Sequence, residues 1–208
     1  MKISTFPVFW ANNEYAQKYY IGTTPTDKQV EEIERELEYK LPQSYIALIK
    51  QCNGGEPINK CFPTQTPTSW ANNHIAISGI MGIDKDKPYS LCGEMGSRFW
   101  IEEWGYPNIG IAICTTPSAG HDMIFLDYSK CGLTGEPSVV HIDEETDYKI
   151  TTLAASLRSL FVDLLIQKTL KVKSSVTKRD NAYSVPRLTI TDNYIIDVLL
   201  TVAYEKDY

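Results

Sequence analysis

The residues best suited to chemistry are two histidines and three aspartates in the second half of the chain. They are His121, Asp122, Asp127, His141 and Asp143. Such side chains are common metal ligands, and His141 and Asp143 share one face of a strand because alternate residues point to the same side. The neighbours His121 and Asp122 point to opposite faces, which weakens joint ligation. Since no HxxxH, HExxH or DxDxDG spacing occurs, we expect polar strand-end residues, no metal and no cofactor.

Nucleophilic catalysis finds equally little support in the sequence. Ser118 lies in PSAG, which is not the GxSxG pattern of a nucleophile elbow. A Cys114–His121 pair would require the fold to bring the two side chains together, and Gly93-x-x-Gly96 is not a phosphate loop. We therefore predict that the protein is not an enzyme. An uncharacterised metal-dependent hydrolase is the least favoured of the functions considered.

Acidic and aromatic residues give better evidence of binding. Five glutamates between positions 31 and 38 concentrate charge on one expected helix, and two tryptophans flank a later pair of glutamates. Aromatic side chains beside carboxylates suit an interface with a basic protein. The alternatives are a solvated helix face for the glutamates and burial in the core for the tryptophans. The residues predicted to contact a partner are Glu31, Glu34, Glu38, Trp100, Glu102, Glu103, Trp104 and Asp127.

Two helices in series are expected to position the first acidic group. Thr26 and Gln29 have the spacing of a capping box. The apolar stripe that follows consists of Val30, Ile33, Leu37 and Leu41. Pro42 suits the first turn of a second helix, and Asn53-Gly54-Gly55 ends that helix because Asn and Gly accept left-handed backbone. The structural motif comprises Leu41, Pro42, Tyr45, Asn53, Gly54 and Gly55. A binding loop at 53–55 is the alternative reading.

The remaining elements are strands followed by a helix. Apolar patterns predict short helices over residues 11–20 and 94–104, strands over 58–62, 74–80, 109–114, 123–128 and 138–142, and a helix over 152–167. Close spacing with glycine-containing turns indicates an antiparallel meander. The order of helices, strands and a final helix predicts an α+β fold in which a mostly antiparallel sheet packs against helices.

Composition narrows the class of partner. The chain has 208 residues and a net charge of -6, which disfavours nucleic acid and favours a basic partner. No apolar run reaches the ~18 residues that span a membrane, and the first residues lack the apolar core of a signal peptide. Five cysteines without a CxxC pair suit reduced thiols. We expect a cytoplasmic protein that binds neither nucleic acid nor membrane.

Charge divides the chain into two parts. Residues 1–167 hold 13 basic and 21 acidic residues, a net charge of -8, and form the expected domain with its extra N-terminal helix. Residues 168–208 hold 7 basic and 5 acidic residues, a net charge of +2. This extension begins as a basic linker and continues with an expected strand over 187–191 and helix over 194–205. The helix is apolar almost all round, so it needs cover from the core or from a partner subunit in a homodimer.

Several of these motifs together resemble the SUKH superfamily, which includes the Smi/Knr cell-wall regulators of fungi and many bacterial immunity proteins. The resemblance covers roughly residues 20–167. Its most specific part is Leu41-Pro42-x-x-Tyr45 followed by Asn53-Gly54-Gly55. Supporting segments are the acidic helix at 30–37, residues 110–113, 120–128 and 135–140, and a final helix that ends in FVDLL.

This resemblance carries its own expectations about fold and function. It implies a sheet packed against helices, no known enzymatic activity and no fixed catalytic motif. Bacterial members bind secreted polymorphic or contact-dependent toxins, often nucleases, and block them. The resemblance therefore implies an intracellular immunity protein whose partner is a basic toxin domain. A non-enzymatic regulatory or scaffold module, as the fungal relatives suggest, is the alternative.

Overall fold

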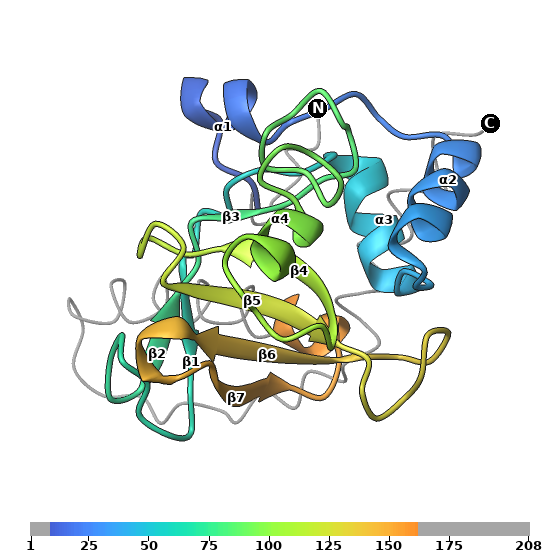
Figure 1. Cartoon of the computed structure of the whole chain (residues 1–208). Coiled ribbons are helices and arrows are strands. Elements are labelled where there is room, and N and C mark those ends of the chain that lie inside the picture. Colours follow the sequence, from blue (N-terminus) through green and yellow to red (C-terminus); the bar gives the residue numbers. More distant parts are fainter. Residues whose placement is uncertain (1–8, 162–208) are drawn as a thin grey trace, which may run out of the picture.

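The structure is a computed structural model that describes residues 9–161. Figure 1 shows its helices and strands. In chain order they are α1 (Glu14–Tyr19), α2 (Asp27–Leu37), α3 (Gln43–Gln51), β1 (Cys61–Pro63), β2 (His74–Ala76), β3 (Gly79–Ile80), α4 (Ser97–Glu102), β4 (Gly110–Thr115), β5 (Asp122–Asp127), β6 (Ser138–Asp143), the 3₁₀ turn η1 (Glu144–Thr146) and β7 (Lys149–Ala154). The predicted α+β class is confirmed.

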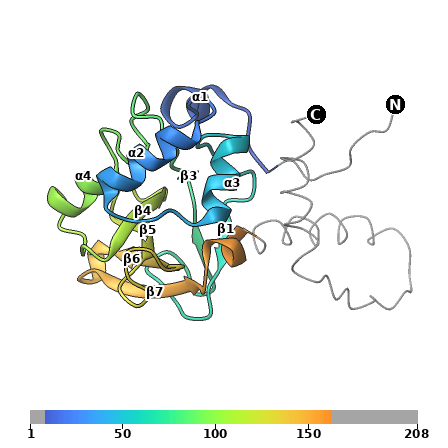
Figure 2. The same ribbon diagram turned by 90° about the vertical axis from the view of Figure 1, so that its right-hand side faces the viewer.

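Strands β3 to β7 form one antiparallel sheet in chain order, as expected for a meander. Strands β1 and β2 pair separately as a short hairpin. The central strands β4 and β5 are buried along their whole length, whereas the edge strand β7 is mostly exposed. Figure 1 and Figure 2 both place α1, α2 and α3 on the β3 side of the molecule and β7 at the opposite edge.

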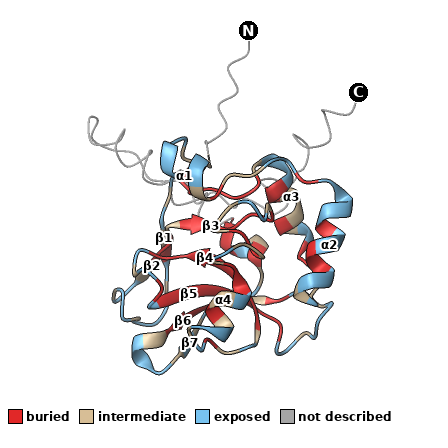
Figure 3. Cartoon of the chain, turned by 45° about the horizontal axis from the view of Figure 1, so that its top comes forward, coloured by how far each residue is buried: buried red, intermediate tan, exposed pale blue. Residues whose placement is uncertain are grey.

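Helix α2 begins as the sequence predicts. The Thr26 hydroxyl accepts the Gln29 N–H at 3.3 Å, and the Gln29 side chain accepts the Thr26 N–H at 2.9 Å, which completes the capping box. Val30 and Ile33 bury the inward stripe, and Figure 3 shows buried and exposed residues alternating along the helix. The helix ends where Glu38 adopts a left-handed backbone with φ of 65°.

Helix α3 begins one residue later than expected. Pro42 occupies the N-cap position, and its carbonyl oxygen accepts the N–H groups of Tyr45 and Ile46. Tyr45 is fully buried, and its hydroxyl donates to the Met81 carbonyl at 2.7 Å. The Leu41-Pro42-x-x-Tyr45 segment therefore joins the helical layer to the strand region.

The turn after α3 requires a glycine at position 54. Gly54 has φ of 87°, and a Cβ atom there would lie 2.7 Å from both the Gly82 nitrogen and the Tyr20 carbonyl oxygen. Beside it, the Asn53 side chain donates to the Thr23 carbonyl at 2.7 Å and accepts the Ile83 N–H at 2.8 Å. The motif therefore ends α3 and joins two neighbouring loops.

Several expected elements differ from the structure. Residues 149–154 form the edge strand β7, so the helix predicted over 152–167 is wrong at its start: residues 157–161 are helical, after Ser156 accepts the Ser159 N–H at 3.3 Å. The leucine spacing from Leu153 to Leu157 suggested one helix across this break. The strand expected over 74–80 is two strands, β2 and β3, and α4 is shorter than expected.

Two further findings concern the cysteines and the lengths of the described helices. All five cysteines have free thiols. Within residues 9–161, no helix is both long enough and apolar enough to cross a membrane. The end of the predicted helix over 152–167, and the predicted linker, strand and helix of residues 168–208, lie outside the described residues.

Candidate partner-binding surface

The fold brings the two predicted acidic segments together. The C-terminal part of α2 and the helix α4 line two adjoining depressions of about 280 and 340 Å³. Glu36, Leu37, Arg98 and Glu102 line both depressions, so we treat the two as one surface, called the α2–α4 surface. These two helices are far apart in the sequence, and Figure 3 shows both with exposed residues on the outside of the molecule.

Negative charge dominates this surface. Its carboxylates belong to Glu36, Glu38, Glu94, Glu102 and Glu103, and its one lining cation is Arg98. Arg98 pairs with Glu102 at 3.6 Å, and Lys85 pairs with Glu36 from outside the depressions. The bond from Lys85 lowers the pKa of Glu36 despite partial burial. Within the described chain, Glu38, Glu94 and Glu103 have no ion pair, so three carboxylates remain for an outside cation.

Apolar side chains accompany these charges. Leu37, Tyr39, Ile101 and Phe99 are half-buried at the rims, and Leu133 is 56% exposed. Exposed apolar groups beside unpaired carboxylates can bury area and choose the sign of the partner's charge at the same time. The α2–α4 surface therefore combines exposed carboxylates with partly exposed apolar side chains.

The two predicted tryptophans have different positions. Trp100 is 5% exposed, its indole N–H donates to the Met95 carbonyl at 2.9 Å, and it packs against Tyr106. Trp104 is half-buried at the surface, with its ring 5.8 Å from that of His121. Trp100 therefore belongs to the core, which was the alternative reading, and only Trp104 is placed to meet a partner.

Burial also withdraws Glu34 and Asp127 from the accessible surface, which corrects the sequence-based expectation. Both are 8% exposed. Glu34 accepts the Leu41 N–H at 2.9 Å and bonds the Lys40 ammonium at 2.6 Å. Asp127 accepts the N–H and the hydroxyl of Ser129 at 2.9 and 2.6 Å, which closes the turn after β5. Their carboxylates are used inside the fold.

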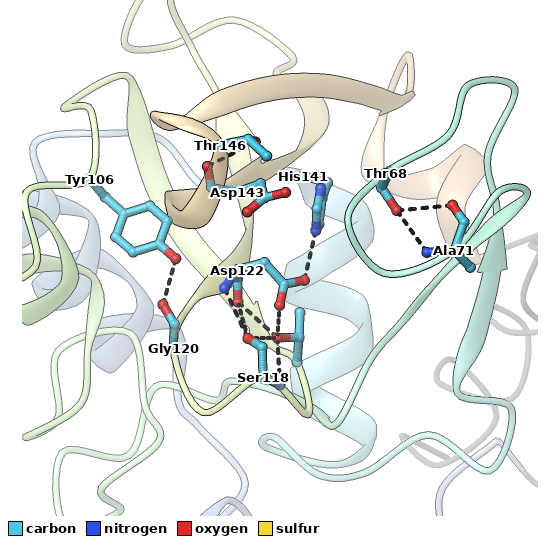
Figure 4. A network of polar contacts seen from close by, with 10 residues as sticks. Thr68, Ala71, Tyr106, Ser118, Gly120, Asp122, His141, Asp143 and Thr146 are labelled. Carbon is cyan, nitrogen blue, oxygen red and sulfur yellow. Dashed lines mark hydrogen bonds and ion pairs between the residues drawn. The ribbon is translucent and has the colours of Figure 1, made fainter.

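Two of the candidate chemical residues, Asp122 and His141, belong to a buried polar cluster, shown in Figure 4. The His141 Nε2 lies 2.6 Å from the Asp122 Oδ2, the Thr116 hydroxyl donates to the Asp122 Oδ1 at 2.9 Å, and the Ser118 Oγ accepts the Asp122 N–H at 2.9 Å. Burial opposes ionisation of Asp122, but the bonds from His141, Ser118 and Thr116 outweigh it and lower the pKa of this carboxyl.

This cluster does not have the access that catalysis requires. The His141 and Asp122 side chains are 1% and 5% exposed, so a substrate could not reach them without opening the sheet. His121 instead points outward, as expected from alternation, with its side chain 51% exposed beside Glu144. Among the described residues, no group of three or more His, Cys, Asp or Glu side chains could hold a metal ion. The hydrogen bonds of the cluster join β5, β6 and the 116–118 turn.

Sequence reasoning missed part of the α2–α4 surface. Glu94 and Leu133 lie in loops without a periodic pattern, and Tyr39 follows the end of α2. The tertiary fold places them at the same two depressions as Glu102. Glu31, which was predicted, is exposed but lines a separate groove farther along α2.

Comparison with known proteins agrees with this fold. The SUKH_6 family model, described as SMI1-KNR4 cell-wall, matches residues 27–161. That span starts at the first residue of α2 and includes the whole five-stranded sheet. A search of the curated proteins found no match. Because the family match covers more than half of the chain, and the α+β architecture accompanies it, this protein belongs to the SUKH superfamily, in its SMI1-KNR4 family.

Proposed function

We propose that the protein is a cytoplasmic immunity protein that binds and neutralises the toxin domain of a bacterial polymorphic or contact-dependent system. Direct contact with the α2–α4 surface covers a basic region of the toxin, and no bond is made or broken. Membership of the SUKH superfamily supports this proposal, since its domains are generally of the non-enzymatic immunity type.

One observation carries the proposal: Glu38, Glu94 and Glu103, which have no ion pair among residues 9–161, surround half-buried apolar side chains on the same surface. Unpaired carboxylates attract a basic protein during encounter, and complementary charge mainly raises the association rate. Apolar contacts such as Leu133 and Tyr39 then slow dissociation, which is where most differences in affinity arise.

The test uses the full chain and toxin domains encoded beside its gene. Survival is measured when each domain is co-expressed with the protein, and affinity is measured by calorimetry. We expect protection by one such domain, and at least about tenfold weaker binding by the Glu102→Lys/Glu103→Lys variant. Glu14→Lys/Glu145→Lys is the matched control, because it changes the net charge equally at exposed residues outside the surface. Absence of binding and protection with every neighbouring domain would reject the proposal.

A regulatory or scaffold module is the second candidate function. The description of the matching family as SMI1-KNR4 cell-wall favours it. The same acidic surface would then hold a basic partner that is not toxic. Binding to a neighbouring gene product without any effect on survival would support this alternative over the immunity function.

A further inference from the structure

A second groove lies beside the α2–α4 surface and shares no residue with it. The N-terminal part of α2, the start of α3 and the loop between β5 and β6 line this groove, which has a volume of about 540 Å³. We call it the LP groove, because Leu41 and Pro42 of the family motif help to line it. The two surfaces are continuous along the β5–β6 loop, where Leu133 lines one and Thr134 lines the other.

Apolar side chains line part of the LP groove. Val30, Leu41 and Pro42 are buried, and Ile46 is half-buried. The volume lies within the roughly 300–1,000 Å³ of small-molecule sites, so the groove has room for a long side chain of a partner. These lining residues offer contact to an aliphatic stem.

The charges of the groove do not balance. Asp27 pairs with Lys50, and Glu34 pairs with Lys40. Glu31 and Glu136 have no ion pair within residues 9–161. Burial raises the pKa of Glu136, which is the direction expected of a carboxylate without a neighbouring cation. Four lining carboxylates against two ammonium groups leave a net charge of -2.

We propose that the LP groove binds a lysine or arginine side chain of the same toxin partner, as a second anchor beside the α2–α4 surface. This inference rests on the proposed function. Lysine and arginine combine an aliphatic stem, which suits Val30, Pro42 and Ile46, with a cationic head, which suits Glu31 and Glu136. An apolar side chain would leave the two carboxylates uncompensated, and an acidic one would be repelled.

Two anchors along α2 restrict how the partner can dock. A basic residue in the LP groove fixes one point, and the contact at Glu102 and Glu103 fixes another on the α2–α4 surface. A wrong partner that satisfies one anchor leaves the other carboxylates without a cation, so the pair contributes specificity.

The test uses a small probe, so that it does not depend on the toxin. Butylguanidinium, which carries the arginine head on an aliphatic stem, is titrated into the ¹⁵N-labelled full chain and followed by NMR. We expect saturable shifts at Val30, Glu31, Ile46 and Glu136, and at least about fivefold weaker binding to Glu31→Gln/Glu136→Gln. The Glu102→Gln/Glu103→Gln variant should keep the shifts in the LP groove. Equal shifts with butanol, or no saturable shift there, would overturn the proposal.

Two further measurements separate this proposal from the proposed function. Toxin affinity that falls with Glu102→Lys/Glu103→Lys, but not with Glu31→Gln/Glu136→Gln, would refute the second anchor while the immunity function stands. Saturable binding of butylguanidinium in the LP groove, together with no toxin partner, would instead support a cation site in the groove and reject the immunity function. Zero-length carbodiimide crosslinking of the full chain tests another occupant, since a product joining Glu31 or Glu136 to a lysine of residues 168–180 would assign the groove to this chain itself.

Discussion

Removal of the Glu34 carboxylate should destabilise the fold, although this residue lies in the acidic segment of α2. Glu34 is 8% exposed and accepts the buried Leu41 N–H at 2.9 Å. Glu34→Ala leaves that N–H without a partner, and an unsatisfied buried donor costs about 1–3 kcal/mol. The higher helix propensity of alanine returns only about 0.3 kcal/mol. The ion pair with Lys40 adds little, because that ammonium is 59% exposed and screened by water.

A loss of about 2 kcal/mol in the free energy of unfolding corresponds to a melting temperature lower by about 4–8 °C for a chain of this length. Urea unfolding at constant pH, followed by circular dichroism, gives the free energy directly. Glu34→Gln is the matched control, because its amide oxygen still accepts the Leu41 N–H and it should lose less stability than Glu34→Ala. Lys40→Ala should leave the midpoint nearly unchanged. Equal effects of Glu34→Ala and Lys40→Ala on the free energy of unfolding would refute the structural role of Glu34. Unchanged stability of Glu34→Ala would have the same meaning.

Three other substitutions test separate parts of the structure. Gly54→Ala should lower the free energy of unfolding by about 1–2 kcal/mol because of the left-handed backbone, and by about 1–3 kcal/mol more because of the contact with the Gly82 nitrogen. An unchanged urea midpoint would contradict both contributions. Tyr45→Phe should cost about 1–2 kcal/mol, because the Met81 carbonyl loses its buried donor, whereas Tyr15→Phe at an exposed site is the control. The bond to Glu144 raises the pKa of His121 above 6.5, so this pair stabilises the fold below pH 6.5 and the contribution fades as pH rises through the raised value. NMR titration should show a lower His121 pKa in Glu144→Gln, and an identical titration curve would disprove the coupling.

Local sequence patterns predicted the parts of the fold that depend on neighbouring residues. The capping box of Thr26 and Gln29 and the positive φ at Gly54 are properties of a few consecutive residues, and both occur in the structure. The meander was also predictable, since glycine-containing turns separate its central strands. The strand β7 was not, because Leu153 continues the helical spacing of the leucines that follow it. Pairing with β6 along the sheet edge, rather than the spacing of apolar residues, decides the conformation there.

The candidate surface was only partly predictable, because charge in a sequence does not show where a carboxylate lies. Glu34 and Glu38 stand four residues apart in one acidic segment, yet the first is buried and the second is exposed beyond the helix end. Trp100 and Trp104 likewise divide between core and surface. The position of Glu38 and Glu102 at the same depression depends on tertiary packing that no local pattern records.

The two sides of α2 have separate roles, since the inward side packs in the fold and the outward side is exposed. Val30, Ile33 and Glu34 face inward, whereas Glu31 and Glu36 are exposed. Exchanges at exposed helix positions usually change stability by less than about 0.5 kcal/mol. Substitutions at the exposed positions of α2 can therefore change the surface that this helix presents to a partner, while the buried positions keep the fold.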